Sequence, residues 1–187
     1  STRSAIFPIV MERLRNSLLL AGLTMLIGVP LAVFLGVVAG LNEEKGADNA
    51  ISIGALAVVG LPEFVTGLVL IQIFSRWLGW FPANSSIESD ATFIEKLPML
   101  ILPAMTATFV LLAYIIRLTR AGVIEELHRP YVRTATLKGL PQRTVIFKHV
   151  LRNALLPTIT VIAISFGWLI SGLIVIENVF NYPGLGR

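Results

Sequence analysis

The sequence predicts an all-α protein, a bundle of membrane-spanning helices that forms one domain over residues 1–187. Of the 187 residues, 55% are hydrophobic and only 14% are charged, and the mean hydropathy is +0.81. A soluble domain carries about 25% charged residues, so this chain has too few to cover a surface in water. The apolar residues also form long uninterrupted blocks, which neither an amphipathic helix nor an amphipathic strand would produce. Both observations indicate that lipid surrounds most of the chain.

Four apolar blocks are long enough to cross a membrane, because a helix needs about 20 apolar residues to span the hydrocarbon core. They cover residues 17–41, 50–75, 97–116 and 154–176. Glu63, in the second block, is the only charged residue in any of them. None of the blocks shows the alternation of a membrane β-strand, so we expect four helical spans.

The basic residues predict how these spans are oriented, because cytoplasmic loops of membrane proteins are rich in Lys and Arg. The loop of residues 117–153 holds eight of the fifteen basic residues and only two acidic ones, so we place it in the cytoplasm. Residues 76–96 hold two basic and three acidic residues and are predicted to face outside. This orientation conflicts with two segments, since it puts Arg3, Arg13 and Arg15 outside and Glu43, Glu44 and Asp48 inside. Acidic residues count for little in this rule, and the central loop outweighs three arginines.

Within the cytoplasmic loop, proline and glycine predict two short helices separated by a sharp corner. Pro130 suits the first position of a helix, where a missing N–H costs nothing. That helix can run to Lys138 and end at Gly139, since glycine readily adopts the left-handed conformation that follows a helix. Pro141 then begins a second helix, which leads directly into the last span.

The first of these helices has features of a docking surface. Ala135 and Gly139 are four residues apart on one face, where small side chains allow another protein to approach the backbone. Arg133, Lys138 and Arg143 surround them as ion-pair donors. Such a loop could fit a cleft on a soluble partner, or it could lie against anionic lipid headgroups, which attract basic segments. The residue pattern alone leaves both interpretations open.

The loop sequence resembles the EAA loop of type I ABC importer permeases, and within them the dipeptide/oligopeptide/nickel permease family. The resemblance rests on Y-V-R-T-A at residues 131–135, K-G-L at 138–140 and R-N-A-L-L-P at 152–157. E-N-V-F-N-Y-P-G-L-G-R at residues 177–187 is the next most distinctive match. The resemblance implies that a separate ATPase subunit is contacted by Tyr131, Arg133, Thr134, Ala135, Lys138, Gly139, Leu140, Pro141 and Arg143.

Two departures from the family pattern accompany the resemblance. Arg133 stands where the superfamily's loop is named for Glu, and Thr134 stands where it has Ala, a replacement common in the peptide branch. Family members also carry one span before the position of Glu12 and another after that of Arg187. We therefore expect the fold to be incomplete in this chain, with its flanking spans missing.

The resemblance implies a multi-pass permease subunit in the bacterial inner (cytoplasmic) membrane. Such a subunit forms the path for peptides or similar small solutes and works by alternating access. Its implied partners are membrane lipid, a second permease subunit in a heterodimer, two ATPase subunits that hold ATP and Mg, and an extracytoplasmic solute-binding protein. The chain would not itself be an enzyme, and nucleic acid is not among its implied partners.

Two acidic residues are candidates for the translocation path. A charge at the centre of a span costs about 2.5–3.5 kcal/mol, so Glu63 is expected to face a cavity or another protein group. It could bind the amino terminus of a peptide, pair with a partner subunit, or stay protonated within the bundle. Glu177 lies closer to the outer boundary, where a structural cap or a gate is the expected role.

Other chemistries have no support in the sequence. The chain has no cysteine, and its two histidines, His128 and His149, form no metal-ligand cluster. A G-x-x-x-x-G-K-[ST] phosphate loop and an H-E-x-x-H metal motif are both absent, so we expect no cofactor in this chain. An ion-driven secondary transporter or a membrane scaffold without transport activity remain the alternatives, although the first predicts inverted repeats that are not visible here.

Overall fold

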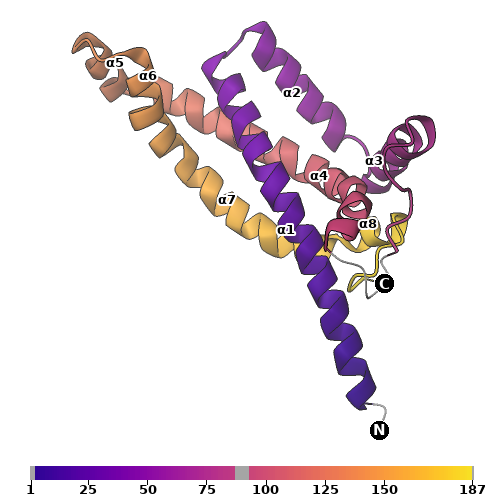
Figure 1. Ribbon diagram of the computed structural model, residues 1–187. Helices are drawn as coiled ribbons and strands as arrows, with labels where there is room; N and C mark the ends of the chain where they lie inside the picture. Colours follow the sequence, from indigo (N-terminus) through magenta and orange to yellow (C-terminus); the bar gives the residue numbers. More distant parts are fainter. Residues whose placement is uncertain (1–2, 87–92, 187) are drawn as a thin grey trace. The chain divides into compact units, whose positions relative to one another are not determined.

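The computed structural model describes residues 3–86 and 93–186. In this part of the chain all regular structure is helical, which confirms the predicted all-α class. Six residues of the predicted outer loop, 87–92, and the last residue of the second motif, Arg187, lie outside the described residues. The elements, labelled in Figure 1, are α1 (Arg3–Leu41), α2 (Gly46–Val59), α3 (Glu63–Leu70), η1 (Ile71–Trp77), α4 (Phe93–Leu127), α5 (Pro130–Leu137), α6 (Gln142–Thr144), η2 (Val145–Val150), α7 (Leu151–Gly172) and α8 (Ile174–Val179).

Three described helices are long and apolar enough to cross a membrane, and they extend well beyond the predicted blocks. The qualifying stretches are Ile6–Leu41, Lys96–Leu127 and Gln142–Leu169. The blocks were shorter because apolarity marks the part of a helix that suits lipid, whereas the helix itself continues through charged residues. In the most apolar stretch of α4, 67% of the residues are buried, against 28% in α1. α4 is therefore enclosed by protein to a much greater degree than α1.

The block at residues 50–75 is not one continuous helix, which corrects the sequence prediction. α2 ends at Val59, α3 begins at Glu63, and the two helices are bent by 105°. Pro62 has φ −57° and ψ 143°, outside the helical region. Proline also lacks an N–H and disfavours a helical conformation at the residue before it, so the sequence Gly60-Leu61-Pro62 interrupts the helix. The last block, 154–176, is also divided, since α7 ends at Gly172 and α8 begins at Ile174.

The chain divides into two compact units, which are described separately below. Unit 1 consists of Ser1–Gly28, Val58–Val110 and Phe166–Arg187, and unit 2 of Val29–Ala57 and Leu111–Ser165. The long helices α1, α4 and α7 each contribute residues to both units. The division therefore does not separate the sequence into an N-terminal and a C-terminal half.

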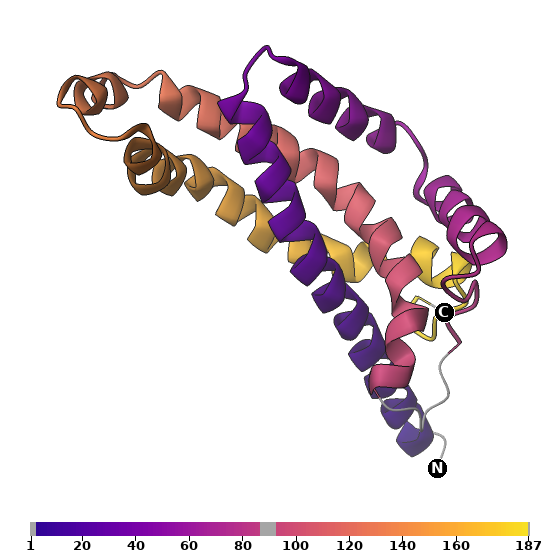
Figure 2. The ribbon, with the colours of Figure 1, turned by 45° about the horizontal axis from the view of Figure 1, so that its top comes forward.

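In unit 1, α3 packs against α8, as Figure 2 shows. A small residue permits this contact, because a Cβ at Gly67 would lie 3.1 Å from Val179 Cγ1 and 3.2 Å from Phe180 Cε2. Phe180 is completely buried. The end of α8 thus anchors the short helix that follows the break in the second span.

In unit 2, glycines allow α1 and α4 to approach closely. A Cβ at Gly36 would lie 2.6 Å from Thr119 Cβ, and one at Gly40 would lie 2.7 Å from Val123 Cβ. Both distances are shorter than real carbon–carbon contacts, so only glycine fits. The spacing of the two glycines is that of a small-xxx-small helix contact, the usual packing device between membrane helices.

Candidate functional site

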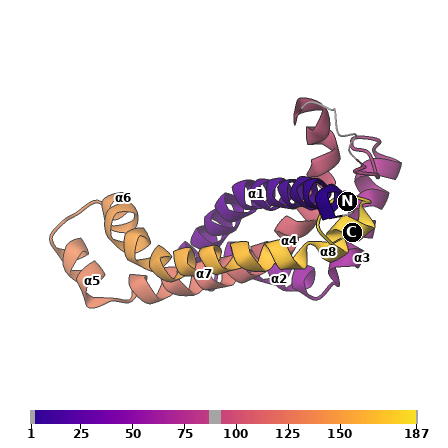
Figure 3. The same cartoon turned by 90° about the horizontal axis from the view of Figure 1, so that it is seen from below.

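The predicted corner between two short helices is present between α4 and α7, and Figure 3 shows α5 and α6 beyond the ends of both. α5 starts with Pro130 in its first turn and ends at Leu137, followed by Gly139 with φ +77°. The Leu140 N–H donates to the Ala135 carbonyl at 3.3 Å, which closes the end of the helix. α6 follows directly after Pro141. Pro130, Gly139 and Pro141 therefore form the corner at the positions predicted from the sequence.

The segment from α5 to η2 exposes apolar and basic side chains. Leu137 is 80% exposed, and on η2 Phe147 is 71% exposed. Arg133, Lys138 and Arg143 are exposed as well, and within the described chain no acidic residue pairs with any of them. Apolar and basic groups that are left without internal partners suit a surface that another molecule covers.

Ala135 and Gly139, the two small residues of the predicted docking surface, differ in exposure. Ala135 is only half-exposed, and α5 packs against η2. Gly139 does face open space, since nothing lies within 4 Å of a Cβ added there. The sequence analysis missed Leu137, whose exposure becomes evident only once α5 has a side that packs on η2.

Tyr131, Thr134, Leu140 and Pro141 complete the predicted set. Thr134 donates to the Pro130 carbonyl at 3.1 Å and Leu140 is 39% exposed. Tyr131 is half-buried, and its hydroxyl donates to Glu126 Oε2 at 2.6 Å. Burial, together with this hydrogen bond, raises the pKa of Tyr131.

A buried ion pair in unit 2 joins the start of α2 to α4. Arg120 Nε lies 2.5 Å from Asp48 Oδ1, and Arg120 Nη2 lies 2.7 Å from Asp48 Oδ2. The Asp48 side chain is 2% exposed, and the Glu44 N–H also donates to it at 2.9 Å. The pair accounts for one of the acidic residues that conflicted with the predicted orientation, since its charge is neutralised within the protein. An aspartate in the first turn of an apolar helix was the available signal, but its partner lies 72 residues away.

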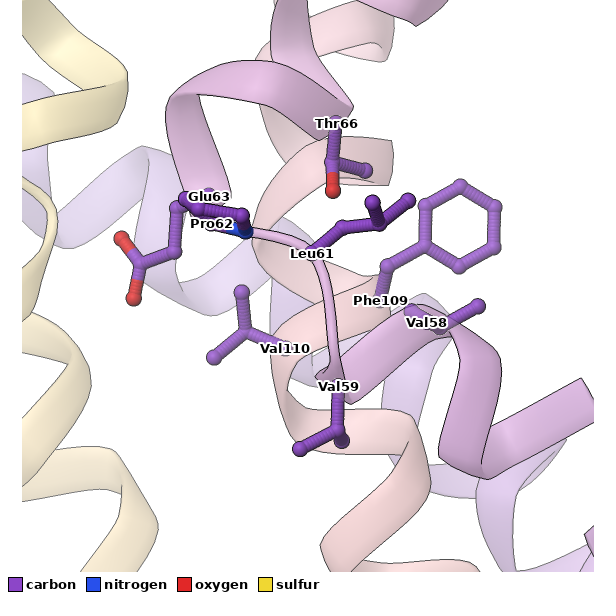
Figure 4. Close-up of a pocket in the computed structure, with 8 residues that line it drawn as sticks. All are labelled: Val58, Val59, Leu61, Pro62, Glu63, Thr66, Phe109 and Val110. Atoms are coloured by element: carbon purple, nitrogen blue, oxygen red, sulfur yellow. The ribbon is translucent and has the colours of Figure 1, made fainter.

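Glu63 begins α3, directly after the break in the second span, and lines two cavities of unit 1. The larger has a volume of about 180 Å³ and is formed mostly by apolar residues around the break and by Phe109 and Val110 of α4. The smaller adjoins α7 and α8 through residues that include Trp168 and Leu169. In Figure 4 the Glu63 carboxylate points away from Phe109 and Thr66. Among the described residues, no cation and no hydrogen-bond donor is paired with it.

Glu177 belongs to a closed hydrogen-bond network in unit 1. It is 1% exposed, and Ser17 Oγ donates to its Oε1 at 2.5 Å. The Gly186 N–H donates to Oε2 at 2.8 Å, and the Leu185 N–H donates to Ser17 Oγ at 2.9 Å. A methyl group at Gly184 would collide with the carboxyl group of Glu177. Of the roles considered for Glu177, this environment favours the structural cap.

A second pair of hydrogen bonds reinforces this network. Tyr182 is buried, and its hydroxyl donates to the Asn16 carbonyl at 2.8 Å. The Asn16 side-chain amide donates to the Pro183 carbonyl at 2.9 Å. Burial and the neighbouring Glu177 carboxylate raise the pKa of Tyr182 well above its usual range, so its hydroxyl stays a donor. Residues 177–186 of this motif therefore fold back on α1.

The apolar spans, the broken second span and the exposed basic corner together define the class as a helical membrane protein. Residues 28–187 match the model of the family described as "Binding-protein-dependent transport system inner membrane component". The chain belongs to this family.

The relatives are permease proteins of peptide and glutathione transport systems. The oligopeptide transport system permease protein AppB of Bacillus subtilis (strain 168) is 34% identical over 181 residues, which are 96% of this chain and 57% of AppB. The di/tripeptide transport system permease protein DppB of Pseudomonas aeruginosa is 33% identical and covers 97% of this chain and 58% of its own length. The glutathione transport system permease protein GsiC of Escherichia coli (strain K12) is 36% identical over 95% of this chain and 56% of GsiC. The chain thus spans a little over half the length of these relatives.

A solved structure shares the fold. The crystal structure of an amino acid ABC transporter with histidines matches 100% of this chain and 78% of that chain, with a TM-score of 0.73 and 17% sequence identity. Together with the family match, this confirms the predicted type I ABC importer permease fold. Neither a secondary transporter nor a scaffold is favoured by these comparisons. Within the described chain, no group of three or more His, Cys, Asp or Glu residues could hold a metal ion.

Proposed function

We propose that this chain is a membrane-spanning permease subunit of an ATP-driven importer in the inner (cytoplasmic) membrane of a bacterium. It would form the translocation path for peptides or similar small solutes. The observation that carries the proposal is the α5–α6 corner, which exposes Leu137 and three basic side chains without internal partners. Exposing apolar side chains to water costs free energy, and contact with another protein would remove this cost.

The partners follow from the same proposal. The sequence contains no phosphate-binding loop, so ATP and Mg would be held by two separate ATPase subunits that contact α5 and α6. A second permease subunit, in a heterodimer with this chain, would complete the path, and a solute-binding protein would deliver cargo on the outer side. Arg133, Lys138 and Arg143 would meet acidic groups of the ATPase, and Thr134, Ala135, Gly139, Leu140 and Pro141 would lie at or beside the contact.

Alternating access requires that the ATPase contact α5 differently in its two states, because a bound partner shifts an equilibrium only by its differential affinity. α5 lies between the ends of α4 and α7, so a displaced α5 carries force to two long helices. Closure of the ATPases on ATP would therefore alter the arrangement of the spans. Reopening after hydrolysis would restore it.

Binding of the ATPase through α5 can be tested with the full-length permease and its ATPase. Leu137→Asp places a charge at the most exposed apolar side chain of α5, and we expect ATPase retention in co-purification to fall at least tenfold, as at the centre of an interface (about 2 kcal/mol). Leu185→Asp, the same change at a leucine that is 41% exposed in unit 1, should leave retention unchanged. Equal retention by both variants and the wild type would refute the contact.

Two other substitutions serve this test less well. Ala135→Trp also enlarges a docking residue, but Ala135 is half-buried, so the larger ring would disturb the packing of α5 on η2. A side chain at Gly139 is strained by the positive φ of +77°, whatever binds there. Leu137 avoids both problems because its side chain supports nothing within its own chain.

For the translocation path we propose Glu63, and we assign Glu177 a structural role. The break at Pro62 exposes backbone groups within a span, which membrane proteins tolerate where the backbone lines a cavity or is covered by protein. Glu63 is half-buried and is one of the residues lining two cavities there, and its carboxylate has no described partner. A negative charge in this position would attract a cationic group of a passing solute.

Uptake measurements on the assembled transporter test the role of Glu63. Glu63→Gln keeps the size and removes the charge, and we expect uptake to fall by roughly tenfold, the scale of one lost charge contact. Thr66→Ala, which changes another residue of the same cavity without a charge, should have a much smaller effect. Loss of the second permease subunit from purified Glu63→Gln complexes would instead assign Glu63 to subunit pairing, and unchanged uptake would exclude it from the path.

A further inference from the structure

The corner where α4 turns into α5 contains a tyrosine that contacts both helices next to it. Tyr131, in the first turn of α5, donates its hydroxyl hydrogen to Glu126 Oε2 at 2.6 Å. Glu126 is at the end of α4, and its side chain is only 15% exposed. A hydrogen bond to a carboxylate that is sheltered from water is stronger than one between neutral groups.

On its other side the same hydroxyl faces the start of α7. Asn153 Nδ2 donates to Tyr131 Oη at a long distance of 3.5 Å, and α5 packs against η2, which leads into α7. The hydroxyl therefore lies between the ends of two long helices. In the described chain, the other side-chain hydrogen bonds of α5, from Thr134 and Thr136, return to its own backbone.

α5 depends on such contacts because it cannot hold its position alone. It has eight residues, far fewer than the roughly 12–15 that an isolated helix needs in water. Its N-terminus has no side-chain cap, since Arg129 in the capping position makes no such bond. Arg129 instead pairs with Glu125 at 2.7 Å and with Glu126 at 3.4 Å, and the Glu125 pair is largely exposed to solvent. An exposed ion pair of this kind contributes little.

The Tyr131 hydroxyl remains protonated, so it can always donate its hydrogen bond to Glu126. Burial and the carboxylate of Glu126 raise its pKa, so the hydroxyl keeps its hydrogen throughout the neutral range. The hydrogen bond to Glu126 would be lost only in strongly alkaline solution. No change of pH inside a cell would release it.

We propose that Tyr131 is a positioning residue that fastens α5 to α4 and α7, so that force applied to the exposed face of α5 moves both helices together. This inference rests on the proposed function, because the force would come from an ATPase bound to α5. Without the tyrosine hydroxyl, α5 would still carry Leu137 and its basic side chains to the partner. However, α5 would then move separately from α4 and α7 and would not transmit the movement of the ATPase to them.

Tyr131→Phe in the complete transporter, reconstituted in lipid vesicles with its ATPases, second permease and binding protein, tests this directly. The variant removes one oxygen atom and keeps the ring. We expect the ATPases to remain bound and to hydrolyse ATP, while the amount of solute imported per ATP falls about five- to tenfold. This range corresponds to the loss of one typical intramolecular hydrogen bond.

The partner residue provides matched controls. Glu126→Gln keeps an oxygen that can accept the hydrogen bond and should retain most of the import per ATP. Glu126→Ala should reproduce at least the defect of Tyr131→Phe, and the double variant Tyr131→Phe/Glu126→Ala should be no worse than Glu126→Ala alone, because Glu126→Ala has already removed the contact with Tyr131. A purely structural role would lower the unfolding temperature and ATPase retention in parallel with import, and would not spare ATP hydrolysis.

The outcomes separate this inference from the proposed function. If the wild-type permease holds no ATPase through α5, the proposed function and the inference fail together. If the wild type holds the ATPase and Leu137→Asp releases it, but Tyr131→Phe imports as much solute per ATP as the wild type, only the role of Tyr131 is refuted. Additive defects of Tyr131→Phe and Glu126→Ala would also refute it, since the two residues would then act separately.

Discussion

The α5–α6 corner and the segment after α7 carry the two longest family-like motifs, but the polar side chains of the two motifs lie in opposite environments. At the corner, Arg133, Lys138 and Arg143 remain exposed and have no acidic partner in the described chain. In the second motif, Glu177 and Tyr182 are buried and hydrogen-bonded within unit 1. A motif that leaves its polar groups free indicates a surface for a partner, whereas one that satisfies them internally indicates a structural role.

The buried motif should be the more sensitive of the two to small changes. Gly184→Ala would push a methyl group into the carboxyl group of Glu177, which Ser17 and Gly186 hold in place. We expect a loss of about 1–3 kcal/mol in the free energy of unfolding, the usual cost of an overfilled site. Thermal unfolding of the purified permease in detergent, compared with the wild type, would measure it.

Gly22→Ala provides the control for this prediction. Gly22 lies in α1 of the same unit, and nothing lies within 4 Å of a Cβ added there. Because alanine favours a helix over glycine, this variant should be as stable as the wild type or more stable by up to about 1 kcal/mol. If Gly184→Ala is as stable as Gly22→Ala in thermal unfolding, the Glu177 network adjusts to the added methyl group. The contrast between the two motifs would then disappear.

The same contrast shows how far the sequence could predict this molecule. Apolar blocks predict that long helices are present, because a membrane helix needs about 20 apolar residues, but they do not predict where those helices end or break. Pro130, Gly139 and Pro141 determine the corner through local backbone preferences, so its two helices could also be predicted. Pro62 carries the same kind of local information about the break in the second span.

Contacts between distant residues could not be predicted in this way. Ser17 and Glu177 are separated by 160 residues, and Asp48 and Arg120 by 72. Neither pair is visible as a pattern in the sequence, because the packing of the helices determines which of these residues come into contact. The exposure of the α5 side chains also depends on packing: Ala135 is half-exposed, and Leu137 is the exposed apolar residue.

The smallest effect on stability is expected at the basic side chains of the corner. In a triple variant, Arg133→Ala, Lys138→Ala and Arg143→Ala remove three exposed groups that support nothing within the described chain. The free energy of unfolding should therefore change by less than about 0.5 kcal/mol. ATPase retention should weaken, and it should also lose most of its dependence on salt, because exposed charges act over distances that ions screen. Co-purification at low and high ionic strength measures this dependence.

Arg129→Ala is the matched control, since Arg129 is also a basic residue of the corner but pairs with Glu125 and Glu126. Its loss should cost the permease a few tenths of a kcal/mol, as expected for exposed ion pairs between neighbouring turns, and should leave the salt dependence of ATPase retention as it is in the wild type. The opposite result is that the triple variant unfolds more readily and Arg129→Ala weakens retention. It would show that Arg129, and not the three unpaired basic residues, contacts the ATPase. The exposed charges would then stabilise the permease itself, and the partner would have to recognise α5 through Leu137 and its apolar neighbours, together with Arg129.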